Sequence, residues 1–279
     1  MTNLSNSETK VVRKHAYQAH PFHLVNPSYW PLLGALSAFL TTLGTALYMH
    51  NYVGGGFVFL FGLFSVFFTM FVWWRDVINE ALQGHHTKAV QTGLKYGVVL
   101  FIVSEIMFFF AFFWAFFHSS LSPTLEIGCI WPPKGINVFH PFEVPLINTM
   151  LLLLSGVSVT WSHHAMVEGK PSEAAAGLFI TVVLASIFTM FQGLEYVEAT
   201  FDISDSVYGS TFYMTTGLHG LHVLVGTIFL AVCLARHYLG HFTATHHVGF
   251  EAAIWYWHFV DVVWLFLYAF VYYWGGLCV

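Results

Sequence analysis

The stretch 95–120, KYGVVLFIVSEIMFFFAFFWAFFHSS, is apolar over a length that allows one helix to cross a lipid bilayer. About 20 helical residues, each rising 1.5 Å, cover the hydrocarbon core. One carboxylate, Glu105, lies near the middle, and its helical neighbours three and four positions away are all aromatic or aliphatic. An ionised carboxylate at this depth costs roughly 2.5–3.5 kcal/mol on insertion scales, so we expect Glu105 to face protein or water and to hold a proton. Two interpretations stay open: a structural acid that bonds to a neighbouring helix, and a proton-linked or regulatory carboxyl.

The composition indicates a polytopic membrane protein. Of the 279 residues, 57% are hydrophobic and only 8% are charged, against about 25% charged in ordinary soluble proteins. The nine basic residues are too scattered for a nucleic-acid surface, so we expect no nucleic-acid partner. Three cysteines without a CxxC pair predict neither a disulfide framework nor a thiolate metal site. Residues 1–14 lack the apolar core of a secretory signal, so no cleaved signal is expected.

Seven apolar runs predict seven transmembrane helices in an all-α protein. They lie at about 32–50, 57–74, 95–120, 146–166, 174–195, 209–236 and 250–274. The long polar break after the second run suggests two bundles. The chain then divides into an N-terminal segment (1–31), a two-helix bundle (32–75), a connecting segment (76–95) and a five-helix bundle (96–279).

The basic residues predict the orientation of these helices. On this topology eight of them fall on the side of the N-terminus, and Lys134 alone falls on the other. The positive-inside rule therefore places the N-terminus and the connecting segment in the matrix or cytoplasm. The eight are Lys10, Arg13, Lys14, Arg75, Lys88, Lys95, Lys170 and Arg236.

Seventeen histidines invite a metal or haem interpretation, because neutral imidazole is a common metal ligand. The adjacent pairs 85–86, 163–164 and 246–247 all fall at the basic-side ends of spans or in loops. Neighbouring side chains on a helix also diverge by about 100°, so a pair does not chelate by itself. We therefore expect no metal site in this chain.

Two further polar pairs lie within the predicted spans. His219 and His222 share one helix face, but nearby glycines favour a close helix contact across which the histidines bond, over a pair of metal ligands. His258 and Asp261 are likewise three residues apart near mid-membrane, where pairing with each other would offset the cost of burying either one. Structural pairing is the preferred interpretation for both.

A mixed group of side chains gathers at the basic-side interface, and it suits a phospholipid head group. The competing interpretation is ordinary interfacial anchoring by amphipathic side chains. The group comprises Trp74, Arg75, Glu80, His86, Lys95 and Arg236.

Several long motifs together resemble one known family, subunit III of cytochrome c oxidase, over about residues 15–279. They are FVWWRDV, GHHTKAVQ, FIVSEIMFFFAFFWAFFHSSLSP, WPPKGI, GVSVTWSHHA, DSVYGSTFYMTTGLHGLHVLVGT and GFEAAIWYWHFVDVVWLFLY. The resemblance implies seven transmembrane helices in two bundles, helices 1–2 and helices 3–7, around a V-shaped cleft filled with phospholipid. It implies no haem or copper in this chain. Haem a, haem a3 and copper belong to partner subunits of the family.

The resemblance also implies an accessory role in reducing dioxygen with electrons from cytochrome c, coupled to proton pumping. Subunit III of the family packs directly on subunit I, in a complex with subunit II and further small subunits. It supports proton uptake by subunit I and protects the enzyme against inactivation during turnover. The mitochondrial inner membrane is the expected location, with the N-terminus in the matrix and the C-terminus in the intermembrane space.

Individual residues carry the resemblance further. Glu105 matches the intramembrane carboxyl of the family that reacts with carbodiimide. Head-group positions of the family match Trp74, Glu80, His86, Lys95 and Arg236. However, the segment NEALQGHH is one residue shorter than in animal members, and Asn79 replaces a basic residue there, so a head-group contact is expected to be missing.

Two alternative functions remain. One is a redox-catalytic membrane subunit that uses some of the histidines, and metal analysis of the separated chain would distinguish it. The other is a proton-coupled transporter that uses Glu105. Against a transporter, the chain has no matching pair of Gly/Pro-broken helices, and seven spans do not divide into equal repeats.

Overall fold

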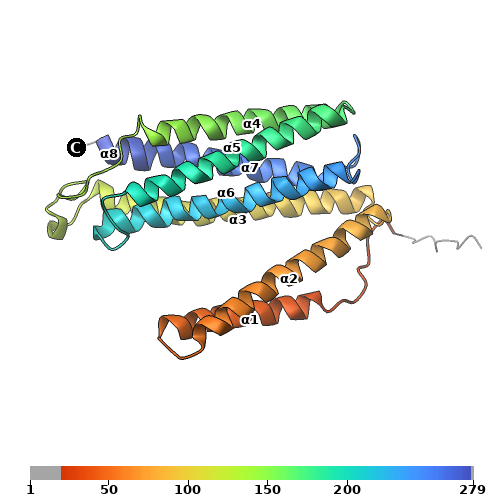
Figure 1. Cartoon of the computed structure of the whole chain (residues 1–279), viewed down its shortest axis with the longest axis horizontal. Coiled ribbons are helices and arrows are strands. Elements are labelled where there is room, and N and C mark those ends of the chain that lie inside the picture. The colour runs from red at the N-terminus through yellow and green to blue at the C-terminus, as the bar shows by residue number, and fades with distance from the viewer. Residues whose placement is uncertain (1–19, 278–279) are drawn as a thin grey trace, which may run out of the picture. The chain divides into compact units, whose positions relative to one another are not determined.

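The computed structural model describes residues 20–277, and this part of the chain is helical without any strand (Figure 1). Within it, seven helices are long and apolar enough to cross a membrane. The prediction of an all-α polytopic protein with seven transmembrane helices is thereby confirmed. The helices are α1 (Trp30–Met49), α2 (Gly55–Leu82), α3 (Lys88–Leu121), α4 (Val144–Val167), α5 (Pro171–Glu198), α6 (Ser206–Tyr238) and α7 (Val248–Phe266).

Most helices extend beyond the apolar runs that predicted them. The connecting segment predicted at 76–95 is largely helical, because α2 continues to Leu82 and α3 already begins at Lys88. The residues after Arg75, DVINEAL, include charged and polar side chains but no glycine or proline, so nothing in them ends a helix. Hydropathy therefore marks where the chain leaves the lipid, not where the helix ends. The helix α2 continues until shortly before the first helix breaker, Gly84.

Two short elements and a π-helix complete the chain. The 3-10 helix η1 (Leu125–Ile127) lies in the proline-rich connection before α4. After α7 the last span widens into the π-helix η2 (Leu267–Trp274), and the one-turn helix α8 (Gly275–Leu277) follows. The π-helix keeps the span continuous, and its wider turn rotates the aromatic side chains of η2 relative to the faces of α7.

The chain forms two compact units, one ending at Gly93 and the other beginning at Leu94. The first unit contains α1 and α2, which touch through glycines. A Cβ atom at Gly44 would lie 2.2 Å from the backbone N of Phe59, and one at Gly62 would lie 2.5 Å from the backbone N of Thr41. Such small residues let two transmembrane backbones approach closely, where dispersion forces hold them together.

The second unit contains α4 to α7 and most of α3, with α7 at its core. The indole N–H of Trp257 donates to the Ser155 hydroxyl at 2.9 Å, and that of Trp264 donates to the Thr149 hydroxyl at 2.9 Å. All four residues are buried. Each tryptophan thus fills the interior of the bundle while a hydroxyl of α4 satisfies its only polar atom.

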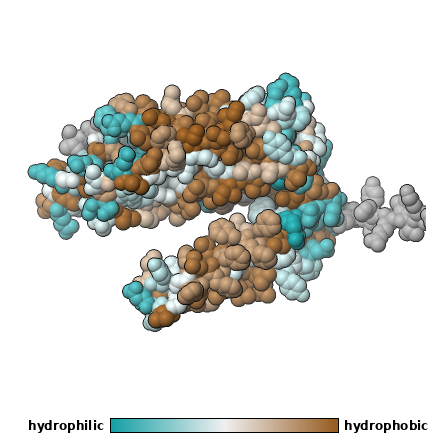
Figure 2. Space-filling model, in the orientation of Figure 1, coloured by the Kyte–Doolittle hydropathy of each residue, from teal (hydrophilic) through white to brown (hydrophobic). Residues whose placement is uncertain are grey.

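The surface of each unit is apolar where a soluble protein would be polar. Large side chains such as Phe64, Phe110 and Phe179 are more than half exposed. Figure 2 shows hydrophobic residues along the sides of the helices and hydrophilic residues toward their ends. This pattern fits helices whose sides contact lipid, and the protein is a multi-pass membrane protein.

Candidate functional site: polar groups within and beside the membrane

Glu105 of α3 has a partner on another helix. Its Oε2 atom lies 2.9 Å from Nε2 of His222 on α6. The other ring nitrogen of this histidine, Nδ1, lies 2.8 Å from the backbone carbonyl oxygen of Leu218. The Glu105 side chain is 19% exposed and that of His222 is 10% exposed, so water has little access to the contact. Sequence reasoning left open whether Glu105 bonds to another helix, and it had no means to identify a partner 117 residues away.

The donors and acceptors of this pair restrict where its protons lie. A carbonyl oxygen only accepts, so Nδ1 of His222 carries a hydrogen and donates it to Leu218. If the imidazole is neutral, Nε2 is then an acceptor and the Glu105 carboxyl must be protonated to donate to it. If the imidazole is charged, Glu105 is a carboxylate. Both arrangements have zero net charge, which makes the pair compatible with its depth in the membrane.

His219 does not join this pair. Its ring is fully buried between α6 and α7, and its Nε2 atom lies 3.1 Å from the backbone carbonyl oxygen of Val260. It packs against the rings of Phe188 and Trp264. The two histidines of the GLHGLH motif therefore bond to different helices and do not converge on one ligand.

The predicted pairing of His258 with Asp261 is wrong. Nε2 of His258 lies 3.3 Å from the hydroxyl of Thr160 on α4, and no hydrogen bond or ion pair joins the two residues anywhere in the described chain. Oδ1 of Asp261 is buried and has no partner among residues 20–277. Asp261 instead lies against Gly156, where a Cβ atom would be 3.0 Å from Oδ2. The prediction failed because α4 supplies a competing hydroxyl that spacing along α7 cannot reveal.

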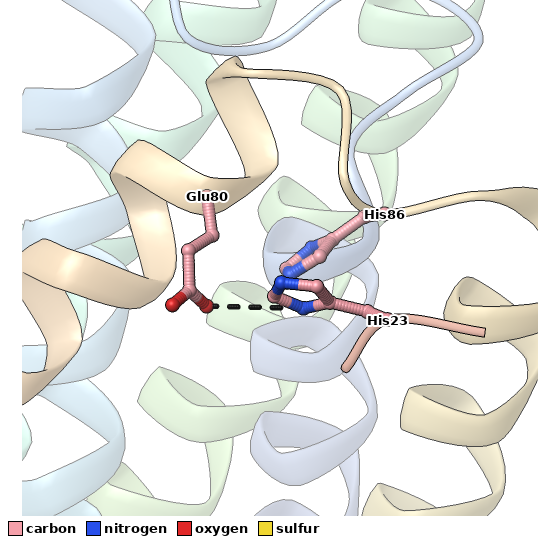
Figure 3. A group of neighbouring side chains, drawn as sticks. All are labelled: His23, Glu80 and His86. Carbon is pink, nitrogen blue, oxygen red and sulfur yellow. Dashed lines mark ion pairs between the residues drawn. The ribbon is translucent and has the colours of Figure 1, made fainter. Parts of the chain in front are cut away.

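Four of the six interfacial residues belong to the first unit. Trp74 is exposed, and the guanidinium of Arg75 donates to Asp76 at 2.9 Å. The Glu80 carboxylate points from α2 toward the ring of His23, at 4.0 Å, with the ring of His86 beside it (Figure 3). One ligand atom from each of His23, Glu80 and His86 lies within 4.8 Å of the others, which is close enough to hold a cation. Sequence reasoning missed His23, because nothing in its local pattern ties it to α2.

The other two interfacial residues, Lys95 and Arg236, belong to the second unit. The ammonium of Lys95 forms an ion pair with Glu251 in the first turn of α7. The guanidinium of Arg236 stacks 4.5 Å over the ring of Phe242 and packs on Gly249. Its Nε atom is buried without a hydrogen-bond partner, and no acidic side chain of the described residues pairs with it.

A second group with metal-ligand geometry lies near Lys95. His163, His247 and Glu251 each bring one ligand atom within 4.8 Å of the others. The group joins the end of α4 to the start of α7. Sequence reasoning considered the neighbouring histidines of the pairs and missed this combination of residues from two helices.

Known proteins resemble the chain over nearly its whole length. The family model described as cytochrome c oxidase subunit III matches residues 20–276. "Cytochrome c oxidase subunit 3" of Prototheca wickerhamii is 64% identical over 258 residues, which cover 92% of this chain and 98% of that protein. The protein of the same name from Triticum aestivum is 62% identical over 93% of this chain and 98% of its own length. That of Chondrus crispus is 58% identical over 99% of this chain and 100% of its own length.

Proposed function

The chain belongs to the cytochrome c oxidase subunit III family and so forms a complex with other oxidase subunits, and from this premise we propose that it is a lipid-holding, non-redox core subunit. In this role it packs directly on subunit I, in a complex that also contains subunit II and further small subunits. Those partners carry haem a, haem a3 and copper, reduce dioxygen with electrons from cytochrome c, and pump protons. This chain binds structural phospholipid, supports proton uptake by subunit I and protects the enzyme from inactivation during turnover.

The engagement of the intramembrane histidines supports a non-redox role. Both ring nitrogens of His222 and one of His219 contact oxygen atoms of the chain itself. Haem or copper ligation by His222 would have to break one of its two contacts, at a cost of about 1–3 kcal/mol for the buried group left unsatisfied. Nδ1 of His219 has no partner among the described residues, but Nε2 holds the ring against α7. Iron and copper analysis of this chain, separated from its partners in mild detergent, tests the proposal. Stoichiometric iron or copper would favour the redox alternative.

The observation that best supports phospholipid binding is the unpaired cation Arg236. Its guanidinium is partly buried at the end of α6, where its Nε–H lacks an acceptor. The guanidinium stacks on the ring of Phe242 and has no carboxylate partner among the described residues, and a lipid phosphate offers oxygens in the bidentate geometry that guanidinium prefers. Lys95, whose ammonium is already paired with Glu251, lies in the same unit, and Trp74, Arg75, Glu80 and His86 of the first unit offer further interfacial contacts.

Replacing Arg236 tests this proposal. In purified oxidase that contains this chain, we expect Arg236→Ala to reduce the phospholipid that remains after detergent washing. The same substitution should also reduce the number of turnovers before inactivation and slow proton uptake. Arg236→Lys should recover part of each effect, because it keeps the charge but loses the fork of donors. Lys134→Ala, which removes a charge predicted on the opposite side, serves as the control. Unchanged lipid content in Arg236→Ala would contradict the assignment.

We also propose the mitochondrial inner membrane as the location, with the N-terminus in the matrix. Among the described residues, five basic side chains fall on one side of the predicted topology, at helix ends or about two turns inside them, and Lys134 alone falls on the other. Protease digestion of mitochondria whose outer membrane has been removed and whose inner membrane is intact tests this orientation. The α3–α4 connection should be cut from outside, and the α2–α3 connection should be protected.

A further inference from the structure

Three side chains meet where the end of α4 approaches the start of α7. His163 lies in the last turns of α4, His247 caps α7, and Glu251 follows in the first turn of α7. His247 and Glu251 are four residues apart, the spacing at which side chains share one face of a helix. The ring of His163 lies edge-on to that of His247, with 5.5 Å between the ring centroids. One ligand atom from each residue lies within 4.8 Å of the others.

The hydrogen bonds around His247 direct a lone pair into this group. Nδ1 of His247 lies 2.8 Å from the backbone carbonyl oxygen of Thr243, so Nδ1 carries the hydrogen. In the neutral ring, Nε2 is then an acceptor, and it lies 3.7 Å from Oε1 of Glu251. An imidazole lone pair that faces a carboxylate oxygen is unfavourable unless a cation lies between them. The cation is either a proton on the ring or a metal ion.

His163 distinguishes these two cations. Its Nε2 atom is buried and has no hydrogen-bond partner in the described part of the chain. A proton on His247 satisfies only the contact with Glu251, whereas a metal ion can bind all three side chains. Bonds of about 2.0 Å at tetrahedral angles place ligand atoms about 3.3 Å apart, close to the separation between His247 and Glu251. The ligand atom of His163 lies within 4.8 Å of the other two, so an inward shift of at most about 1.5 Å completes this arrangement.

The surroundings resemble those that orient metal ligands. Metal-binding histidines usually donate their second N–H to a carbonyl or carboxylate, as His247 does to Thr243. Ligating carboxylates are themselves held by other groups, and Lys95 holds Oε2 of Glu251 while Oε1 faces His247. The Lys95 charge weakens the binding of any cation, and the burial of His247 limits competition from water.

We propose that His163, His247 and Glu251 form a binding site for a divalent transition-metal ion of the Zn²⁺ type. Two histidines and one glutamate are a donor set that zinc accepts, with water in the fourth position. Zinc has no redox chemistry, so the site is compatible with a subunit that carries no electrons. The ion ties α4 to α7 on the side of the membrane where Lys95 and Arg236 lie. The inference stands on the residues of this chain and does not depend on the phospholipid proposal.

The test compares zinc binding by purified oxidase variants. Each complex is stripped with a chelator, equilibrated with Zn²⁺, freed of excess ion and analysed by mass spectrometry for metal per haem. We expect His247→Gln and Glu251→Gln each to bind about one zinc ion fewer than the unaltered oxidase, since a two-ligand remnant binds weakly. The neighbouring variants His164→Gln and His246→Gln should bind the full amount, because their side chains are not in the group.

Equal zinc content in the unaltered oxidase and in both His247→Gln and Glu251→Gln would overturn the proposal. So would an equal loss in the His164→Gln control. If a variant fails to assemble, modification of histidines by diethyl pyrocarbonate in the unaltered oxidase provides the second measurement. Zinc should protect His163 and His247 but not His164, as read by peptide mass spectrometry. If His163 and His247 are modified equally with and without zinc, the metal site is refuted. The alternative, a protonated His247 in contact with Glu251, then accounts for the geometry.

Discussion

Substitution of Glu105 separates two roles for its contact with His222. Glu105→Leu removes the one hydrogen-bond partner that Nε2 of His222 has among residues 20–277. Glu105→Gln replaces the carboxyl with a near-isosteric amide, whose NH₂ group can donate to the same nitrogen. The donation is possible because Nδ1 of His222 already donates to Leu218, which leaves Nε2 as the acceptor. We therefore expect the glutamine variant to assemble and to transfer electrons much as the unaltered oxidase does.

The expected loss follows from the burial of the pair. A buried polar group that loses its partner destabilises a protein by about 1–3 kcal/mol. With 10% of the His222 side chain exposed, water can replace little of the lost contact. Glu105→Leu should then lower the stability of the folded chain by this amount, roughly a 5- to 140-fold change in equilibrium constant. Glu105→Gln should cost less than about 1 kcal/mol, because one hydrogen bond replaces another.

Both variants are measured by heating the purified oxidase and recording the temperature at which this chain is released from the complex. The leucine variant should release the chain at a lower temperature, and the glutamine variant should stay near the unaltered protein. His222→Leu gives the matched change on the other side of the contact, and the double leucine variant should lose less than the sum of the single losses. If the glutamine variant releases the chain as easily as the leucine variant, the contact requires ionic charge and the neutral arrangement is refuted.

Three further substitutions test the packing of the helices, each read from the same melting assay. Gly62→Leu should destabilise the α1–α2 hairpin by about 1–3 kcal/mol or more, since the two backbones leave no space for a side chain. Trp257→Phe should cost about 1–3 kcal/mol, because the smaller ring leaves a cavity at a fully buried site and Ser155 loses the indole donor, although its hydroxyl still donates to Leu152. Tyr272→Phe should cost a similar amount, because the tyrosine hydroxyl donates to the buried Glu195 carboxyl at 2.6 Å. Adding Glu195→Leu should restore part of that last loss, and no recovery would show that the hydroxyl acts elsewhere.

Sequence reasoning predicted the spans well because bilayer thickness sets a length that apolar runs must reach. It also predicted that the lone acid Glu105 faces protein or water, with a bond to another helix as one of two interpretations. It could not identify His222, since the contact depends on how α3 and α6 pack, and the spacing along one helix contains no such information. The error at His258 has the same origin. Two residues three positions apart are neighbours on a helix, but the Thr160 hydroxyl on α4 lies within reach of the ring.

The adjacent histidine pairs show how a sound local argument can miss a site between helices. Two neighbours on a helix point in different directions, and in the pair 163–164 on α4 one ring faces the interior and the other is exposed. The pair 246–247 lies just before α7, and there His247 is the buried member. That divergence argues against chelation by either pair alone. It also means that each pair can supply one inward ring to a contact with another helix, and this is what His163 and His247 do. A search for cation sites in helical membrane proteins should therefore combine inward-facing residues of different helices. Each such residue should also be considered together with the residue four positions later, as Glu251 follows His247.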